Sequence, residues 1–171
     1  MIEAIQGFLN NLFGSSYFGQ SAIVFILSML PAVGGPSVAI PIGAVLGLPM
    51  MLNALMGIAG NILPAPFIIL FVRKIFIWMR KKSRRLGALA DKYEAKAKAN
   101  SSRFRYGSFV GLMLFVAIPL PLPAMGAWSG SLIAAVFDIR LRISLPAIAL
   151  GVVIAGIITT AVTYGFISLV L

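Results

Sequence analysis

Two long apolar stretches of the chain are each interrupted near the middle by proline and glycine. The stretch Phe25–Leu48 contains three prolines and the pair Gly34 and Gly35, and the stretch Phe115–Phe137 contains three prolines at alternate positions. Proline has no N–H group and disfavours a helical conformation in the residue before it, so a regular helix is not expected to continue through either stretch. Backbone groups cannot remain unpaired against lipid, and breaks at membrane depth therefore indicate candidate sites.

The segments beside the two breaks are too short to cross a membrane as helices. Residues 20–30 and 106–118 would form helices about 16 and 20 Å long, whereas the hydrocarbon core of a bilayer is about 30 Å thick. Each interrupted stretch is therefore either a re-entrant hairpin, which enters and leaves on one side, or a single kinked helix that crosses fully. Residues 49–72 and 146–171 are each long enough to span, and Ser144 is expected to cap the second helix.

The composition indicates an integral membrane protein and leaves little material for catalysis. Of 171 residues, 60% are hydrophobic, and the mean hydropathy of +1.03 is too apolar for a soluble domain. Cysteine and histidine are absent, which excludes thiolate nucleophiles, imidazole catalysis and the usual zinc and haem ligands. The four acids, Glu3, Asp91, Glu94 and Asp138, are not spaced as a carboxylate pair. We expect no enzymatic activity, no metal and no cofactor.

The basic residues are concentrated between the two halves of the chain. Residues 73–105 hold 12 of the 14 lysines and arginines, and apolar residues recur among them at the spacing of a basic amphipathic helix. A basic segment beside a spanning helix follows the positive-inside rule and contacts anionic headgroups, so we expect it to be cytoplasmic and not to bind nucleic acid. The residues expected at the lipid headgroups are Arg80, Lys81, Lys82, Arg84 and Arg85.

Charge favours the re-entrant interpretation of the two broken stretches. Four full crossings would place Arg140 and Arg142 on the face opposite the basic segment, against the positive-inside rule. Two hairpins that enter from opposite sides place all 14 basic residues in the cytoplasm and make the two halves inverted repeats. The halves also share features, because Pro31 and Pro119 are 88 residues apart and Ile58–Ala65 is similar to the segment 96 residues later.

The expected fold is a single all-α integral membrane domain over residues 1–171. Two inverted repeats, each a Pro/Gly-broken re-entrant hairpin followed by a spanning helix, are joined by a basic cytoplasmic helix. The expected elements are an interfacial amphipathic helix at 1–14, a hairpin at 20–48, a spanning helix at 49–72, the basic segment at 73–105, a second hairpin at 106–137 and a second spanning helix at 146–171.

The tips of the two hairpins are the candidate substrate site. They offer backbone groups and few side chains, and neither loop contains a titratable residue. Half-helix N-termini, expected at Ile42 and Trp128, would present partial positive charge to an anionic group. The small residues of Gly43–Gly47 and Gly126–Gly130 fit close helix packing equally well, and both roles stay open. The expected substrate-binding residues are Pro31, Gly34, Gly35, Pro36, Ser37, Pro41, Asn61, Pro119, Pro121, Pro123, Gly126, Trp128, Ser129 and Gly130.

Four motifs of this chain carry a family resemblance: AIPIGAVLGLP from Ala39, GN at Gly60, VAIPLPLPAMGAWSGSLIAA from Val116 and LGVVIAGII from Leu150. They resemble the motifs of the small multidrug export proteins, a family distantly related to the DedA and SNARE-associated (VTT) membrane proteins. The resemblance implies an inner-membrane protein with two facing re-entrant hairpins, in a superfamily associated with moving lipids or lipid carriers and linked in some members to proton motive force. The chain departs from the family at Gly35 and Ser37, where an acid and an arginine are usual, and at Ala124 and Met125, where Gly-Thr is usual. The resemblance covers about Ser28–Gly165.

These observations predict a small polytopic transporter of the inner membrane that moves a lipid-like or amphiphilic substrate between the two re-entrant loops. Two alternatives stay open: an exporter of small cationic drugs, and a non-transporting scaffold that recruits partners through residues 73–105. The absence of any acid inside the membrane segments argues against the first alternative. The expected partners are membrane lipids and the substrate, without nucleic acid, and self-association into a homo-oligomer is left open.

Overall fold

The chain is α-helical wherever its structure is described. The computed structural model describes residues 16–31, 35–82, 109–119, 126–137 and 139–170, and no strand occurs within these ranges, which confirms the all-α expectation for them. The expected helix at 1–14 and most of the basic segment lie outside the described residues. The helices are α2 (Tyr17–Met29), α3 (Pro36–Val45), α4 (Met50–Ile62), α5 (Pro64–Lys82), α7 (Ala127–Val136) and α8 (Leu141–Val170), and residues 109–117 are also helical.

Two helical rods are long and apolar enough to cross a membrane. α4 and α5 follow each other with only Leu63 between them, and Met50–Ile75 forms the first candidate span. Leu141–Leu169 of α8 forms the second. The helices α2, α3 and α7 have 13, 10 and 10 residues, so the two shortest are about 15 Å long, half of a hydrocarbon core. The prediction of two long helices separated by short ones is confirmed.

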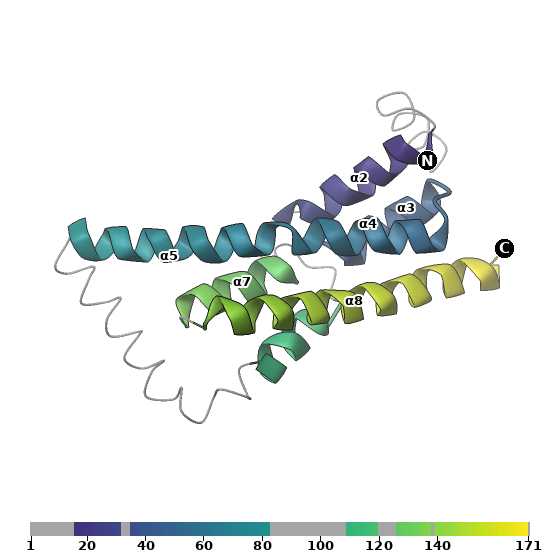
Figure 1. The fold of residues 1–171 in the computed structure, drawn as a ribbon. Coiled ribbons are helices and arrows are strands. Elements are labelled where there is room, and N and C mark those ends of the chain that lie inside the picture. The colour runs from purple at the N-terminus through teal and green to yellow at the C-terminus, as the bar shows by residue number, and fades with distance from the viewer. Residues whose placement is uncertain (1–15, 32–34, 83–108, 120–125, 138, 171) are drawn as a thin grey trace.

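The two rods lie side by side and run in opposite directions, as Figure 1 shows. α2 packs on α3 and α4, α3 also packs on α8, and α7 packs on α5 and α8. The pair α2 and α3 opens toward the end of the molecule where α4 begins, whereas the pair formed by residues 109–117 and α7 opens toward the end where α8 begins (Figure 1). The end of α2, the start of α3 and the start of α7 therefore lie in the middle of the molecule (Figure 1).

The two short returning helices, α3 and α7, each begin after a glycine in a conformation that side chains disfavour. Gly35 has a φ of 65° and Gly126 a φ of 86°, both outside the regions that residues with a Cβ normally occupy. Gly35 O accepts a hydrogen bond from Ala39 N at 3.1 Å. Gly126 O accepts the corresponding bond from Gly130 N at 3.0 Å, with both partners 91 positions later in the chain.

The C-terminal ends of α3 and α7 recur with the same separation. Leu48 N donates to Gly43 O at 3.0 Å, and Ile139 N donates to Ala134 O at 2.9 Å. Each bond closes the wide turn that commonly ends a helix. The two donors are 91 positions apart, and so are the two acceptors. The same order of helix cap, helix and closing turn therefore occurs twice in the described part of the chain.

The first returning helix begins earlier than the sequence indicated. α3 starts at Pro36 and not at Ile42, and Pro41 lies inside the helix as its sixth residue. Pro36 occupies the first helical position, where a missing N–H costs nothing. Pro41 cannot donate to Ser37 O, but the helix is retained because residues such as Ile40 are fully buried against its neighbours and packing outweighs local propensity.

Two further boundaries of the sequence prediction were wrong. α8 begins at Leu141 and not at 146, so Ser144 is not the N-cap; its Oγ donates to the backbone carbonyl four residues earlier, at 3.3 Å. α5 continues to Lys82, although the spanning helix was expected to end at 72. Lysine and arginine are good helix formers, so the change to basic residues ends the apolar run without ending the helix.

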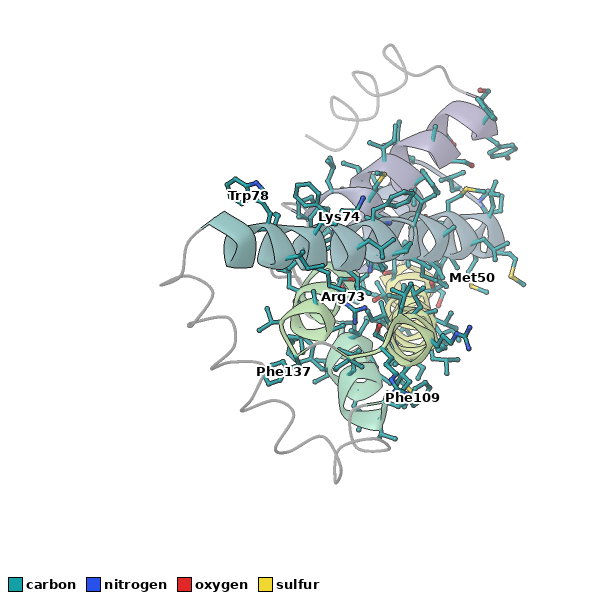
Figure 2. All side chains as sticks on the ribbon, turned by 60° about the vertical axis from the view of Figure 1, so that its left-hand side comes forward. Met50, Arg73, Lys74, Trp78, Phe109 and Phe137 are labelled. Atoms are coloured by element: carbon teal, nitrogen blue, oxygen red, sulfur yellow. The ribbon has the colours of Figure 1, made fainter. Side chains whose placement is uncertain are left out.

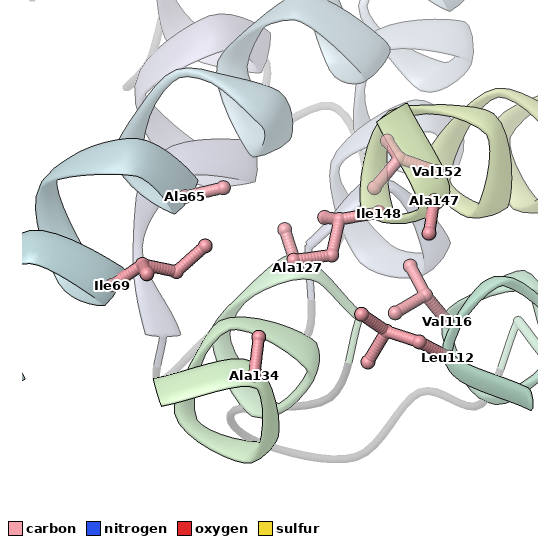
Figure 3. Packing of buried hydrophobic residues seen from close by; sticks show 9 residues of the cluster. All are labelled: Ala65, Ile69, Leu112, Val116, Ala127, Ala134, Ala147, Ile148 and Val152. Atoms are coloured by element: carbon pink, nitrogen blue, oxygen red, sulfur yellow. The ribbon is translucent and has the colours of Figure 1, made fainter. Parts of the chain in front are cut away.

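Small and branched side chains fill the interior around α7 (Figure 3). A methyl group on Gly130 would lie 2.5 Å from Val116 Cγ2, and one on Gly43 would overlap the side chain of Asn53. Each returning helix therefore approaches its neighbours through a glycine, which supports the close-packing role of these two positions. The main cluster consists of Ala65, Ile69, Leu112, Val116, Ala127, Ala134, Ala147, Ile148 and Val152.

Candidate functional site at the meeting of the two breaks

The two returning helices meet at Asn61, a residue of α4. A methyl group added to Gly35 would lie 3.2 Å from Asn61 Nδ2, and one added to Gly126 would lie 3.0 Å from the same atom. The amide of Asn61 therefore lies against the residue that precedes the first turn of α3 and against the one that precedes the first turn of α7. Gly35, Asn61 and Gly126, which the sequence analysis predicted as substrate-binding residues and which lie far apart along the chain, are close together in the structure.

The amide of Asn61 is buried and incompletely paired. The residue is 1% exposed, and its Oδ1 has no hydrogen-bond partner among the described residues. A buried acceptor without a donor costs about 1–3 kcal/mol, and lipid offers no donor that could offset this cost. Unsatisfied groups of this kind in a folded protein often mark a functional site or the position of a bound water or ion. Asn61 is the centre of the candidate site.

α3 and α7 both begin beside this amide. The first N–H groups of a helix have no acceptor within the helix, and the aligned peptide dipoles place partial positive charge at that end. Proline removes one of these donors from α3, at Pro36, whereas α7 begins with the non-proline residues Ala127 and Trp128. Neither helix contains an acidic or basic residue. The arrangement therefore suits a neutral or anionic group that accepts hydrogen bonds.

Trp128 joins the start of α7 to the end of α2. Its indole Nε1 donates to Met29 O at 2.9 Å, a carbonyl in the last turn of α2 for which the helix itself provides no donor. In the first turn of α7, Ser129 Oγ donates to Gly126 O at 3.1 Å. The Trp128 bond ties the start of α7 to the end of α2, and the Ser129 bond closes the first turn of α7.

Prolines leave backbone carbonyls without helical donors near the site. Pro41 lacks the N–H that would pair with Ser37 O in the first turn of α3, and Pro64 lacks the N–H that would pair with Gly60 O, next to Asn61. A ligand at this position can therefore meet backbone donors from the helix N-termini and backbone acceptors from these turns. The site can hold a polar group without using a charged side chain.

The remaining predicted residues lie around the site or outside the described part of the chain. Pro31 follows α2 by two residues, Pro119 follows the helix at 109–117 by two residues, and Ser37 lies in the first turn of α3. Gly130 packs against residues of the 109–117 helix and α8 and not against Asn61. Gly34, Pro121 and Pro123 lie outside the described residues.

The basic residues within the described ranges all lie in α5 or at the start of α8, and we call this end of the molecule the basic end. Arg140 and Arg142 are exposed there. Figure 2 shows Lys74 and Arg73 on α5, with Arg73 on the side that faces α7 and α8. Arg80, Lys81 and Lys82 form the last turn of α5, and Arg84 and Arg85 lie outside the described residues, so headgroup contact by these five residues stays a prediction.

Two long-range contacts were missed from the sequence. Arg73 Nη2 donates to Ile139 O, and Tyr164 Oη donates to Leu48 O at 2.6 Å. Each contact joins the long helix of one half to the backbone just after the returning helix of the other half. Arg73 and Tyr164 are 91 positions apart, like the caps of α3 and α7, but two unlike side chains carry no similarity that could reveal this correspondence.

Comparison with known proteins identifies a family for the part of the chain that carries the site. Residues 36–158 match the family described as putative small multi-drug export protein. The matched range begins at the first residue of α3, contains Asn61 and α7, and ends within α8. No curated protein and no solved structure matches the chain. The more distant relationship to DedA and VTT proteins stays a prediction.

Proposed function

Because this chain belongs to the family of putative small multi-drug export proteins, we propose that it is a small membrane transporter of inverted-repeat type. Its substrate is a lipid-like or amphiphilic molecule that passes between the tips of two re-entrant hairpins. The observation that carries this proposal is the buried, incompletely paired amide of Asn61 between the N-termini of α3 and α7. Transporters commonly bind substrate where broken helices of two repeats meet near the middle of the bilayer.

The inverted repeat is supported by contacts that recur along the chain. The long helices begin at Met50 and Leu141, which are 91 positions apart, as are the caps of the returning helices. A methyl group on Gly60 would overlap the backbone of Phe25 in α2, and a methyl group on Gly151 would lie 2.7 Å from Met113 O. Each rod thus approaches the first helix of its own half through a glycine. The two rods run in opposite directions (Figure 1), as an inverted repeat requires.

The placement in the membrane follows from charge and length. With the two rods spanning, the tips lie near the middle of the bilayer, and the short helices reach it from opposite faces. The basic end, including Arg140 and Arg142, faces the cytoplasm of an inner-membrane protein by the positive-inside rule, and the basic segment that follows α5 contacts anionic headgroups.

Cysteine labelling tests this placement, because the chain contains no cysteine of its own. We expect Asp138→Cys and Ser101→Cys to react with an impermeant maleimide from the cytoplasmic side, and Met50→Cys, at the start of α4, to react from the other side. The measurement is the extent of labelling in oriented vesicles. Labelling of Asp138→Cys and Ser101→Cys from opposite sides would mean that the second broken stretch crosses the membrane fully.

The site defines the chemistry of the substrate. Its donors are backbone N–H groups and Asn61 Nδ2, its unpaired acceptor is Asn61 Oδ1, and the helix N-termini add partial positive charge. An anionic headgroup that combines several acceptor oxygens with a hydroxyl or amine donor is therefore favoured. Acyl chains of the substrate remain in lipid beside the exposed apolar faces of the rods. No titratable residue lies in the described part of the tips, so we expect transport to be downhill and not driven by protons.

Two rival functions were also considered, and the first agrees with the drug export that the family's description names. An exporter of cationic drugs needs an acid near its site, and the sequence contains none in either hairpin. A scaffold that recruits partners through residues 73–105 leaves the buried polar site without a role. We expect no enzymatic activity and no cofactor, and we expect membrane lipids as partners, while homo-oligomer formation is open.

Purified protein in liposomes tests the proposed function. We expect it to accelerate the crossing of a fluorescent lipid analogue with an anionic headgroup more than that of a zwitterionic analogue, measured by chemical quenching of the outer leaflet. An imposed proton gradient should leave the rate unchanged. Faster movement of a cationic dye than of either lipid would favour drug export, and protein that moves neither lipid nor dye would contradict transport.

A further inference from the structure

The contacts of Arg73 and Tyr164 occupy corresponding places at opposite ends of the molecule. Arg73, in α5, donates to the carbonyl of Ile139 at the end of the second hairpin, and Tyr164, in α8, donates at 2.6 Å to the carbonyl of Leu48 at the end of the first. The two donors, Arg73 and Tyr164, are 91 positions apart in the sequence, and so are the two acceptors, Leu48 and Ile139. We call these contacts the Arg73 latch and the Tyr164 latch.

The Tyr164 latch is part of a buried network. Asn53 Nδ2 donates to Tyr164 Oη at 3.0 Å and to Ile40 O at 2.8 Å, and Asn53 is fully buried. The network therefore connects α8 to α3, to α4 and to the turn between them. Separating α8 from the first hairpin requires both hydrogen bonds of Tyr164 Oη, the one it donates to Leu48 O and the one it accepts from Asn53 Nδ2, to break together, because they share this oxygen atom.

With both latches closed, the centre of the protein is sealed. Asn61 is 1% exposed, so a substrate cannot reach the site in this state from either end. A transporter must open one side at a time, since opening both sides at once would create a leak. Polar contacts between otherwise apolar helices have two discrete states, made or broken, which suits them to this purpose.

We propose that the Arg73 and Tyr164 latches are the two gates of the transport cycle and that they open alternately. Breaking the Tyr164 latch releases the first hairpin from α8 and exposes the site to the end opposite the basic one. Breaking the Arg73 latch releases the second hairpin from α5 and exposes the site to the basic end. This inference rests on the proposed function, because a gate has a role only in a transporter. The side on which the protein opens can nevertheless be measured without any transport assay.

The two gates are not equal. Hydrogen bonds from a charged donor are stronger than those between neutral groups, which strengthens the Arg73 latch, whereas the Tyr164 latch relies on two neutral hydrogen bonds of Tyr164 Oη. Loss of either latch shifts the population toward the state in which that side is open.

A cysteine at the tip reports which side is open. Ser37→Cys, in the first turn of α3, is combined with Tyr164→Phe or with Arg73→Gln, and an impermeant maleimide is added to one side of reconstituted vesicles. We expect Tyr164→Phe to raise labelling about two- to tenfold from the side opposite the basic end, and Arg73→Gln to raise it about tenfold from the basic side. Tyr17→Phe, which changes an exposed tyrosine of α2, and Arg73→Lys, which keeps a charged donor, are the matched controls and should resemble the parent.

Side-selective labelling separates gating from general loosening of the structure. If either variant raised labelling equally from both sides, or if neither raised it, the latches would be structural contacts and the proposal would be overturned. Tyr164→Phe removes one oxygen atom and keeps the ring, so it decides the question even if Arg73→Gln does not insert. If the protein does not move lipid but the two variants show side-selective labelling, lipid transport is contradicted, whereas the assignment of the two latches as gates is retained.

Discussion

Gly60→Ala is expected to separate α2 from α4 and to destabilise the protein by about 2 kcal/mol or more. The added methyl group would overlap the carbonyl oxygen of Phe25 and lie 3.1 Å from its carbonyl carbon. These are backbone atoms of the neighbouring helix, so no side-chain rotation can relieve the overlap. In an open helix position the same substitution would stabilise by about 1 kcal/mol, and the loss is therefore due to packing alone.

Gly165→Ala is the matched control for this prediction. Gly165 is an exposed glycine of α8, and a methyl group there would meet nothing within 4 Å. Thermal unfolding of both variants in the same detergent should give a lower midpoint for Gly60→Ala and an unchanged or higher one for Gly165→Ala. Equal stability of the two variants would show that α2 and α4 do not pack as closely as described.

Hydropathy and proline placement were sufficient to predict the order of the helices. The two spans need about 20 apolar residues each, and residues 50–72 and 143–171 are visible in the sequence as long runs without a charged residue. The breaks were visible because glycine and proline are the residues that interrupt helices most strongly. Gly35 and Gly126, which cap the returning helices with positive φ, were selected as site residues before their conformation was known.

The exact correspondence of the two halves could not be predicted. Pro31 and Pro119 are 88 positions apart, whereas Gly35 and Gly126 are 91 apart, because the second tip loop is longer. The similarity of Ile58–Ala65 to the segment 96 residues later does not align equivalent positions, since the long helices that contain them begin 91 apart. Short motifs of glycine, alanine and isoleucine recur by chance in membrane helices, so a loop-length difference hides the true register.

The site itself was only partly predictable. Asn61 was among the residues predicted to bind substrate, and a polar residue inside an apolar helix is costly in a membrane and commonly functional. Its contact with both tips depends on the crossing of α4 with α3 and α7, which no local pattern encodes. The start of α3 at Pro36 was missed because Pro41 was read as a break, although tertiary packing keeps it helical.

Asn61→Leu is expected to abolish most transport without destabilising the protein. Leucine has nearly the shape of asparagine, and it removes an oxygen that has no partner among the described residues. Burying an unpaired acceptor costs about 1–3 kcal/mol, so the unfolding free energy should stay equal or rise. If Asn61 Nδ2 binds the headgroup between the two helix N-termini, loss of a hydrogen bond to a charged group should slow transport about tenfold or more.

Thr159→Val is the matched control for this variant. Thr159 of α8 is also buried, and its Oγ1 also has no partner among the described residues. It lies two helical turns beyond Val152, the residue that corresponds to Asn61 in the second half. The substitution removes a comparable unpaired oxygen away from the tips, so transport should be kept.

The most direct test measures lipid transport and thermal stability of the parent, Asn61→Leu and Thr159→Val in the same liposomes. The account requires Asn61→Leu to be at least as stable as the parent and to have lost most movement of the anionic lipid analogue, while Thr159→Val remains active. A stable Asn61→Leu protein that transports at the rate of the parent would contradict the assignment of the substrate site to the meeting point of the two hairpin tips.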